Sequence, residues 1–187
     1  RGEEGSTVPV TLLGHEGDLM LIHLRRSFEG LQAAQVSVSR LGLSTFLEPT
    51  TSFVSIVELG MYEMTAQIHK RLGERGLVTG SAEFEGAFDA EMEEQRKRVS
   101  GRLWLEVPAR RHVCFYPMNK RRGEVNNWYA LPYEARRQLM QGHARVGRNW
   151  AGKIRQLITG SVGLDESEWG VTLFAKDTHD VKGIVYE

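Results

Sequence analysis

HVCFYPMNKRRGEVNNWY, residues 112–129, is the stretch around which the other segments of the chain are most readily placed. It opens with β-branched, aromatic and small apolar residues at 112–116, which predict a strand. Pro117 ends this strand or confines it to a sheet edge, because proline has no backbone N–H to donate. The stretch therefore predicts an edge strand that leads into a basic turn.

Alternation along the extended run puts Tyr116, Met118 and Lys120 on one side. Two arginines follow at 121–122, and an aromatic pair follows at 128–129. Cations beside aromatic rings suit a flat, anionic, aromatic ligand, since cations pair with carboxylates and rings stack. On these residues alone, a solvated basic turn beside an edge strand is the favoured interpretation.

Length and composition predict a soluble globular protein. The 187 residues are enough for one large domain or two small ones that share a core. Lys+Arg and Asp+Glu both total 24, so the net charge gives no general attraction to nucleic acid or anionic membranes. No apolar run approaches membrane-spanning length. The single cysteine, Cys114, excludes an intrachain disulfide and fits a reducing, cytoplasmic location.

The chain before residue 62 reads as strand, strand, helix, strand. Strands are predicted at 8–13 and 18–25 with a hairpin connection at 14–17. A helix is predicted at 27–47, with Ser27 as its N-cap, and a third strand at 52–59. This order is typical of an antiparallel α+β unit. The densely charged residues 60–101 predict a partly mobile linker or surface excursion, with helical periodicity in 89–99.

The chain after residue 109 reads as strand, helix, strand, strand, helix. A helix begins at Leu131-Pro132 and runs to about Trp150, since proline is favoured in the first turn. Strands follow at 153–159 and 168–175, and a helix begins at 178. This is a ferredoxin-like order without its last strand. We therefore predict an α+β fold of two ferredoxin-like halves with incomplete termini: 1–61, a charged connection at 62–109, and 110–187.

Two residues on predicted apolar faces are candidates for chemistry. His143 lies on a helical stripe, and an imidazole in apolar surroundings can ligate iron. A histidine bonded to a backbone carbonyl is the more frequent situation for such a residue taken alone. Gln156 shares a strand face with Ile154 and Ile158, so its amide requires a partner, either across the sheet or in a ligand. The stripe comprises Ala135, Leu139, Met140, His143 and Val146.

An ordered series of motifs resembles the chlorite dismutase superfamily, in its coproheme decarboxylase branch. The series is YPMNKRR at 116–122, NWY at 127–129, Gly142-His143, Gly147-Arg148, residues 153–163, EWGVTLFA at 168–175 and the final IVYE. It covers 102–187. Before residue 102 the resemblance rests mainly on SFVSIVELG at 52–60.

The resemblance implies a dimeric α+β barrel type of fold with a haem site in the second half. His143 would be the axial ligand of the haem iron. Gln156 would lie on the opposite, distal side, where chlorite dismutases carry arginine. Tyr116 would be a redox tyrosine beside a reactive propionate, because a phenol can lose an electron and a proton. Three further roles are implied: Arg102 and Lys120 as propionate partners, and Met118 and Trp128 as pocket-lining residues.

The implied function is haem biosynthesis: oxidative decarboxylation of coproheme to haem b, with hydrogen peroxide as oxidant. Coproheme would be both substrate and redox cofactor, and the enzyme would be a homo-oligomer, a pentamer in this family. The alternative enzyme is a chlorite dismutase, which Gln156 disfavours. A non-catalytic haem carrier or sensor would keep His143 without needing Tyr116 and Lys120 together. A nucleic-acid module built on the basic turn and Trp128 is opposed by the zero net charge.

Overall fold

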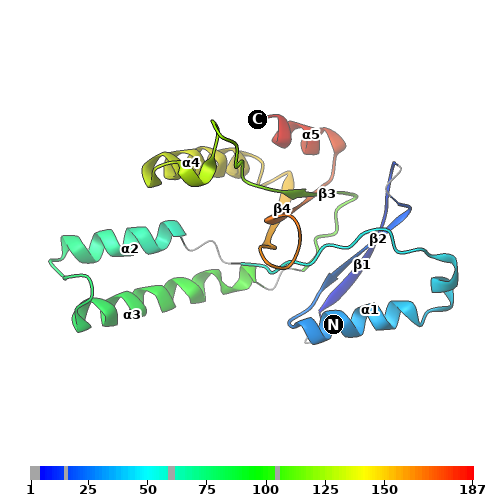
Figure 1. Ribbon diagram of the computed structural model, residues 1–187, viewed down its shortest axis with the longest axis horizontal. Coiled ribbons are helices and arrows are strands. Elements are labelled where there is room, and N and C mark those ends of the chain that lie inside the picture. The colour runs from blue at the N-terminus through cyan, green and yellow to red at the C-terminus, as the bar shows by residue number, and fades with distance from the viewer. Residues whose placement is uncertain (1–4, 15–16, 59–61, 104–105) are drawn as a thin grey trace.

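The computed structural model describes residues 5–14, 17–58, 62–103 and 106–187, and it has mixed helices and strands in two antiparallel sheets. The first sheet contains β1 (Ser6–Thr11) and β2 (Leu19–Leu24), and the second has the strand order β3-β5-β4. Figure 1 shows the first sheet, the second sheet and a helical hairpin in separate regions of an elongated molecule. The predicted α+β class with antiparallel sheets is confirmed, whereas the three domain boundaries remain a prediction.

The N-terminal unit follows the predicted order through its helix. β1 and β2 pair with Val8 opposite Ile22. Helix α1 (Phe28–Ser39) has Ser27 as its N-cap, with the Ser27 hydroxyl accepting the backbone N–H of Gly30 at 3.1 Å. The predicted end at residue 47 was wrong, because α1 ends at Ser39 and a short 3₁₀ turn, η1 (Gly42–Phe46), follows.

Local hydrogen bonding explains why α1 ends early. The Ser39 hydroxyl donates to the carbonyl of Val36 at 2.8 Å, and the Ser44 hydroxyl donates to the carbonyl of Ser39 at 2.8 Å. Serine hydroxyls that bond nearby backbone groups compete with the helical pattern, and Gly42 has low helix propensity.

The predicted strand at 52–59 was wrong apart from one bridge. Ile56 and Gly160 exchange two backbone hydrogen bonds of 2.8 Å, and residue 59 lies outside the described part of the chain. The segment instead packs across the second sheet. The ring of Phe53 meets that of Phe115 at 5.2 Å, and a Cβ on Gly170 would lie 2.5 Å from the Phe53 ring. The apolar pattern of this segment therefore reflects packing on a sheet face.

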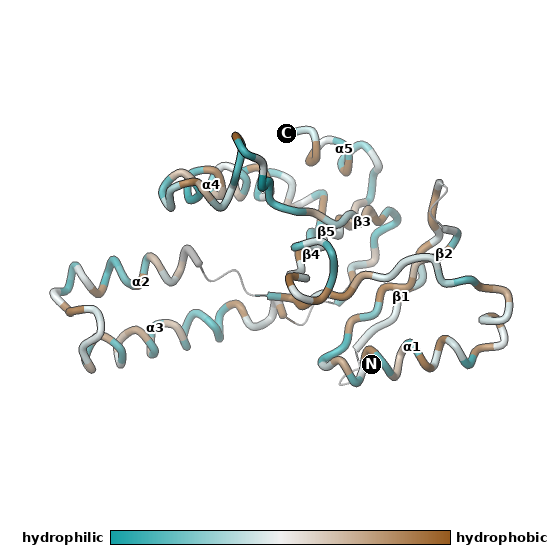
Figure 2. Tube along the Cα trace, viewed as in Figure 1, coloured by the Kyte–Doolittle hydropathy of each residue, from teal (hydrophilic) through white to brown (hydrophobic). Residues whose placement is uncertain are grey.

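The charged region that was predicted as a partly mobile linker folds into a helical hairpin. Helices α2 (Tyr62–Glu74) and α3 (Ala82–Val99) are followed by the short turn η2 (Ser100–Arg102). The hairpin extends away from both sheets, and hydrophobic residues recur in bands along α3 (Figures 1 and 2). It has its own buried cluster, formed by Ile68, Leu72, Phe84 and Met92.

The second sheet has β5 (Trp169–Ala175) between β3 (His112–Met118) and β4 (Ile154–Gly160). Tyr116 pairs with Val171, and Gln156 pairs with Leu173. Because β3 is an edge strand of this sheet, Pro117 is accommodated within it opposite Gly170, and the strand continues two residues past its predicted end.

Two predicted helices complete the C-terminal half: α4 (Tyr133–Asn149) and α5 (Thr178–Tyr186). One face of the sheet carries a buried cluster that packs against Trp150 and against Val181 and Ile184 of α5. The cluster consists of Ile154, Val171, Leu173 and Ala175. Among the described residues, no helix is long and apolar enough to cross a membrane.

Candidate functional site

The residues predicted to carry chemistry on strands share one face of the second sheet. Tyr116 and Met118 pack against the buried cluster that includes Ile154 and Val171. Strand alternation puts Gln156 on the same face as Ile154, and Trp169 on the same face as Val171. At the opposite end of β4 from Ile154, Ile158 is 40% exposed. This face is therefore covered by α5 at one end and open at the other.

Helix α4 approaches this face at one point and the loop after β3 at another. A Cβ on Gly147 would lie 3.2 Å from the amide nitrogen of Gln156, and the ammonium of Lys120 lies 4.0 Å from the sulfur of Met140. His143 is three residues after Met140 and four before Gly147, so it lies on the same side of the helix. The axial-ligand candidate thus belongs to the side of α4 that faces Gln156 and Lys120.

The stripe predicted as a buried face of α4 is more open than expected. Leu139 and Met140 are 56% and 43% exposed, and His143 is also exposed, whereas Ala135 and Val146 are half-buried. An apolar helix side that carries an exposed imidazole is free to cover a ligand. The prediction that these residues share one side of a helix is confirmed, whereas the prediction that this side is buried is wrong.

Lys120 and Trp128 are in direct contact. The Lys120 ammonium lies 4.6 Å from the centre of the Trp128 ring, within the range of a cation–π interaction. Trp128 begins the short turn η3 (Trp128–Ala130), and its backbone N–H donates to the carbonyl of Arg121 at 2.8 Å. The basic loop and the aromatic pair therefore form one unit next to α4. The backbone of Arg102 ends η2, but its side chain lies outside the described part of the structure, so its role remains a prediction.

Burial changes the acidity of two groups on β3. Desolvation is the main cause that raises the pKa of the Tyr116 phenol above its ordinary value, with a smaller contribution from Cys114. Burial likewise raises the pKa of the Cys114 thiol. Tyr116 is consequently a protonated phenol at neutral pH, and any oxidation of it must release a proton.

Glu168 is the residue that sequence reasoning missed. Its carboxylate is buried and accepts hydrogen bonds from the guanidinium of Arg122, from the Tyr129 hydroxyl at 2.6 Å and from the backbone N–H of Lys120 at 2.8 Å. Its own backbone N–H donates to the side-chain oxygen of Asn119 at 2.7 Å. These bonds, with Arg122 first, lower the pKa of Glu168 to about 2. The available signal was an acid just before an apolar strand, the last of three acids at 165, 166 and 168, which is too common to identify such a centre.

Two buried donors suggest what kind of ligand this region can accept. The indole N–H of Trp169 and the Nε of Arg136 are buried and have no hydrogen-bond partner within the described residues. Arg136 precedes His143 by seven residues, so both lie on the same side of α4. Buried donors without acceptors are costly, and an anionic ligand between α4 and the sheet would satisfy them. The donors, the Lys120 cation and the exposed apolar stripe fit a flat molecule with carboxylates.

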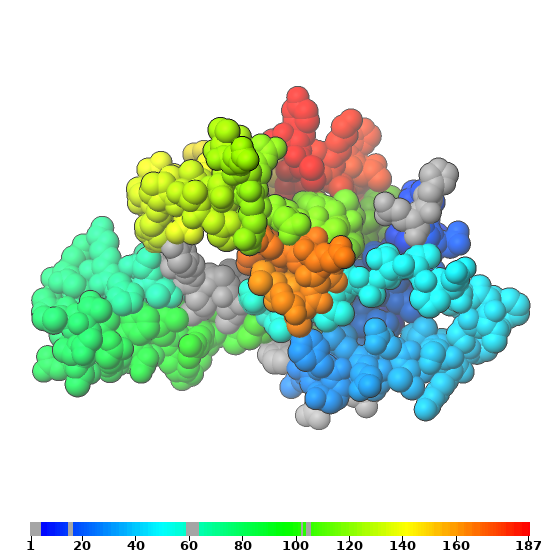
Figure 3. Space-filling view, viewed as in Figure 1, coloured from blue at the N-terminus to red at the C-terminus, as the bar shows by residue number. Residues whose placement is uncertain are grey.

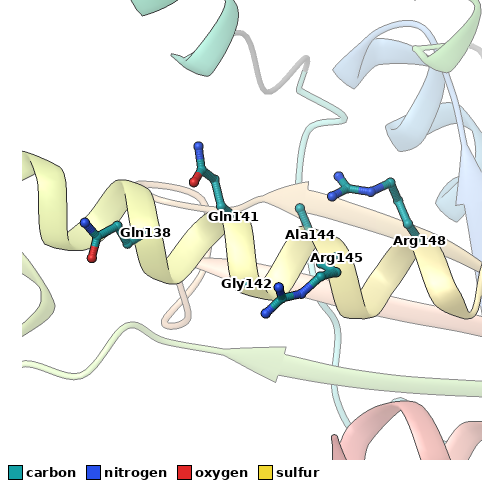
Figure 4. Close-up of a pocket in the computed structure, with 6 residues that line it drawn as sticks. All are labelled: Gln138, Gln141, Gly142, Ala144, Arg145 and Arg148. Carbon is teal, nitrogen blue, oxygen red and sulfur yellow. The ribbon is translucent and has the colours of Figure 1, made fainter.

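A separate depression of about 440 Å³ lies along the outer side of α4. With about 100° of rotation per residue, its lining residues are centred on the side of the helix opposite His143. Figure 4 shows these side chains spreading from α4, and Figure 3 shows the atoms of α4 apart from those of the α2–α3 hairpin, with open space between them. The depression is therefore distinct from the predicted site. Its lining residues are Gln138, Gln141, Gly142, Ala144, Arg145 and Arg148.

In the part of the chain that the structure describes, no three His, Cys, Asp or Glu side chains converge to form a metal site. A single imidazole such as His143 can hold an iron whose other ligands come from a porphyrin. The described residues therefore fit an iron that takes one ligand from the protein, His143, and the others from a porphyrin.

Comparisons with known proteins identify relatives along nearly the whole chain. A coproheme decarboxylase of Staphylococcus saprophyticus is 42% identical over 176 residues, which are 94% of this chain and 62% of that protein. A candidate heme-binding protein of Natronomonas pharaonis is 40% identical over 185 residues, which are 99% of this chain and 28% of that protein. The chain therefore spans less than two thirds of either relative.

A solved structure is also similar to this chain along nearly its whole length. A novel heme-binding protein from Thermus thermophilus superposes with a TM-score of 0.76 at 37% identity, over 97% of this chain and 63% of that one. The family model for chlorite dismutase matches residues 2–187. On this match, the chain belongs to the chlorite dismutase family.

Proposed function

We propose that this protein decarboxylates coproheme oxidatively to haem b, with hydrogen peroxide as the oxidant. The observation that carries the proposal is the meeting of two elements. The sheet face with Tyr116, Met118 and Gln156 lies opposite the side of α4 that carries His143, and the Lys120 cation lies at their border. A 42% identical relative is a coproheme decarboxylase, which supports this choice of substrate.

Binding would draw on both elements. His143 would supply the axial nitrogen for the iron, and Gln156 would lie on the other side of the ring. Lys120 and Arg102 would pair with propionates, since charge-assisted bonds to carboxylates are the strong ones. Trp128, which lies under the Lys120 ammonium, would hold that cation in place and line the pocket together with Met118.

Tyr116 would carry the oxidation to the propionate. When bound, coproheme would supply the redox-active iron through which peroxide serves as oxidant, and the protein would direct that oxidation to the propionate through Tyr116. Tyr116 loses an electron and its proton, and the phenoxyl radical removes a hydrogen atom from the propionate side chain. Loss of a second electron releases CO₂ and leaves a vinyl group. Each propionate thus yields two electrons, one CO₂ and one proton, and one peroxide with two protons accepts the electrons to give two waters.

Gln156 favours decarboxylation over chlorite decomposition. Splitting chlorite leaves an anionic fragment that must be retained near the iron, and a cationic side chain retains an anion better than a neutral amide does. Decarboxylation has no such leaving anion. Gln156 lies beside Gly147 of α4, on the sheet face that also carries Tyr116, and this placement supports the proposed distal role.

A non-catalytic haem-binding protein is the second candidate, because two of the relatives are described by heme binding alone. Titration with coproheme followed by peroxide separates the candidates by absorption spectroscopy. With a decarboxylase, the spectrum of bound coproheme changes to that of haem b after peroxide is added. With a carrier, coproheme binds, and peroxide then only bleaches its absorption.

An oxygen electrode tests the third candidate. Sustained oxygen release from chlorite by the unmodified protein would contradict the assignment and identify a chlorite dismutase. We further propose a cytoplasmic location and a homo-oligomer, a pentamer as the family resemblance implies.

A further inference from the structure

The contacts of Glu168 reach both ends of the loop that carries Lys120. At one end the carboxylate accepts the backbone N–H of Lys120 at 2.8 Å, and Asn119 binds the backbone N–H of Glu168 at 2.7 Å. At the other end the Tyr129 hydroxyl donates to the carboxylate at 2.6 Å. Glu168 itself directly precedes β5, the central strand of the sheet. The loop is thus attached through one carboxylate to the start of the central strand of the sheet.

Arg122 completes the attachment from the solvent side. Its guanidinium binds the Glu168 carboxylate and lies 4.1 Å from the centre of the Tyr129 ring. Tyr129 follows Trp128, whose ring receives the Lys120 ammonium. The cation and the ring of the Lys120–Trp128 pair are therefore both positioned by residues that bind Glu168.

We infer that Glu168 is a positioning residue for the carboxylate-binding cation: it holds the Lys120 ammonium against Trp128, beside α4, where a ligand carboxylate is received. This inference rests on the proposed function. Glu168 need not touch the ligand, because its carboxylate is already occupied by three donors from the loop. The Glu168 carboxylate affects ligand binding only through the position of Lys120, whose backbone N–H it accepts.

The alternative is that Glu168 only braces the fold, as another ion pair does elsewhere in the chain. Glu91 offers a matched control, because its carboxylate also binds guanidinium groups, those of Arg71 and Arg75, and it lies on the α2–α3 hairpin. Removing the ion pairs of either glutamate would lower the free energy of unfolding. Only a positioning role at Glu168 would change the affinity for a carboxylate ligand in a way that depends on Lys120.

The test is a double-mutant cycle on coproheme affinity, measured by spectroscopic titration. The variants are Glu168→Gln, Lys120→Ala and the two combined, with Glu91→Gln as control. We expect Glu168→Gln to weaken coproheme binding by about tenfold, the size of one charge-assisted bond, and to have little effect on the propionate-esterified ligand. In the Lys120→Ala background the same substitution changes affinity less than about twofold, because additivity fails between coupled residues.

A second variant protects the test against a folding defect. Arg122→Gln removes the same ion pair from a side chain that is 63% exposed, so we expect it to fold and to reproduce the Lys120-dependent loss. Equal losses of affinity with and without Lys120 would overturn the inference and leave the proposed function standing. If Lys120→Ala itself leaves coproheme affinity unchanged, the cation does not receive a propionate, and both the inference and that part of the proposed function fail.

Discussion

A phenol, an imidazole and an amide on two adjacent elements are the residues on which the proposed chemistry depends. Tyr116 and Gln156 belong to one sheet face, and His143 belongs to the side of α4 that approaches it. Alternation put Tyr116 beside Met118 and placed Gln156 on an apolar strand face, and helical periodicity put His143 on an apolar stripe, whereas their proposed roles came from the family resemblance. Glu168 could not be found this way, because its importance comes from partners 39 to 48 residues away in the chain.

The first prediction concerns His143. Replacing it with alanine removes the only protein group proposed to bind the iron, and leaves the propionate partners unchanged. We expect the ferric spectrum of bound coproheme to change and its affinity to fall by at least about tenfold, as for loss of a strong ligand bond. A His143→Ala protein with the wild-type spectrum and affinity would show that the axial ligand lies elsewhere. The control is His69→Ala, on the α2–α3 hairpin.

The second prediction is a pH dependence that belongs to Glu168. Its pKa is lowered from 4.5 to about 2 by Arg122, Tyr129 and the Lys120 backbone, so folding favours the ionised form. The stabilisation is fully present above pH 4.5 and is lost as the pH falls toward 2. We expect Glu168→Gln to reduce the free energy of unfolding at about pH 7 by more than it does at about pH 3, as measured by urea titration. A deficit of the same size at both pH values would refute the assigned cause.

At the scale of elements, periodicity predicted most of the strands and helices but not the tertiary use of two segments. Of the hairpin α2–α3, only the helical periodicity of 89–99 in α3 was predicted, because the apolar residues of the hairpin are separated by many charges, several of which form pairs such as Arg71–Glu91. The segment around Phe53 has a strand-like composition, yet its partner is the face of a sheet that forms about sixty residues later. The local pattern of apolar residues indicates which side chains are buried, whereas the surface that buries them is formed by residues far away in the sequence.

The third prediction tests whether the hairpin is a folded unit. Phe84 is almost fully buried between α2 and α3, so Phe84→Ala leaves a cavity that we expect to cost about 3–5 kcal/mol in the free energy of unfolding. Ser81 caps α3 by accepting the N–H of Phe84, and Ser81→Ala is expected to cost about 1 kcal/mol. Urea unfolding followed by circular dichroism measures both changes. Losses below about 1 kcal/mol for Phe84→Ala would indicate that this region is the loose linker that the sequence first suggested.

At the scale of the whole molecule, large apolar side chains remain exposed on the α1–η1 region. Exposed apolar groups that gather in one region are typical of surfaces that meet another chain. The residues are Phe28, Val36, Leu41, Leu43, Phe46 and Leu47.

The fourth prediction follows from this exposure and from the family. We expect sedimentation equilibrium to give an assembly with a mass that is a multiple of 21.1 kDa, five times in the pentamer that the resemblance implies. Changing both Leu43 and Phe46 to serine is expected to shift the equilibrium toward smaller species, with the helical content unchanged as the control. A protein that sediments as a 21.1 kDa monomer at micromolar concentration would contradict the oligomer.

We propose that this chain converts coproheme to haem b through Tyr116. The measurement that tests it most directly is mass spectrometry of the porphyrin extracted after peroxide is added to the coproheme complex. We predict the successive loss of two CO₂ molecules with the unmodified protein, and unchanged coproheme with Tyr116→Phe, which keeps the ring and removes the oxidisable hydroxyl. Recovery of intact coproheme from the unmodified protein, or conversion at the same rate by Tyr116→Phe, would contradict the claim.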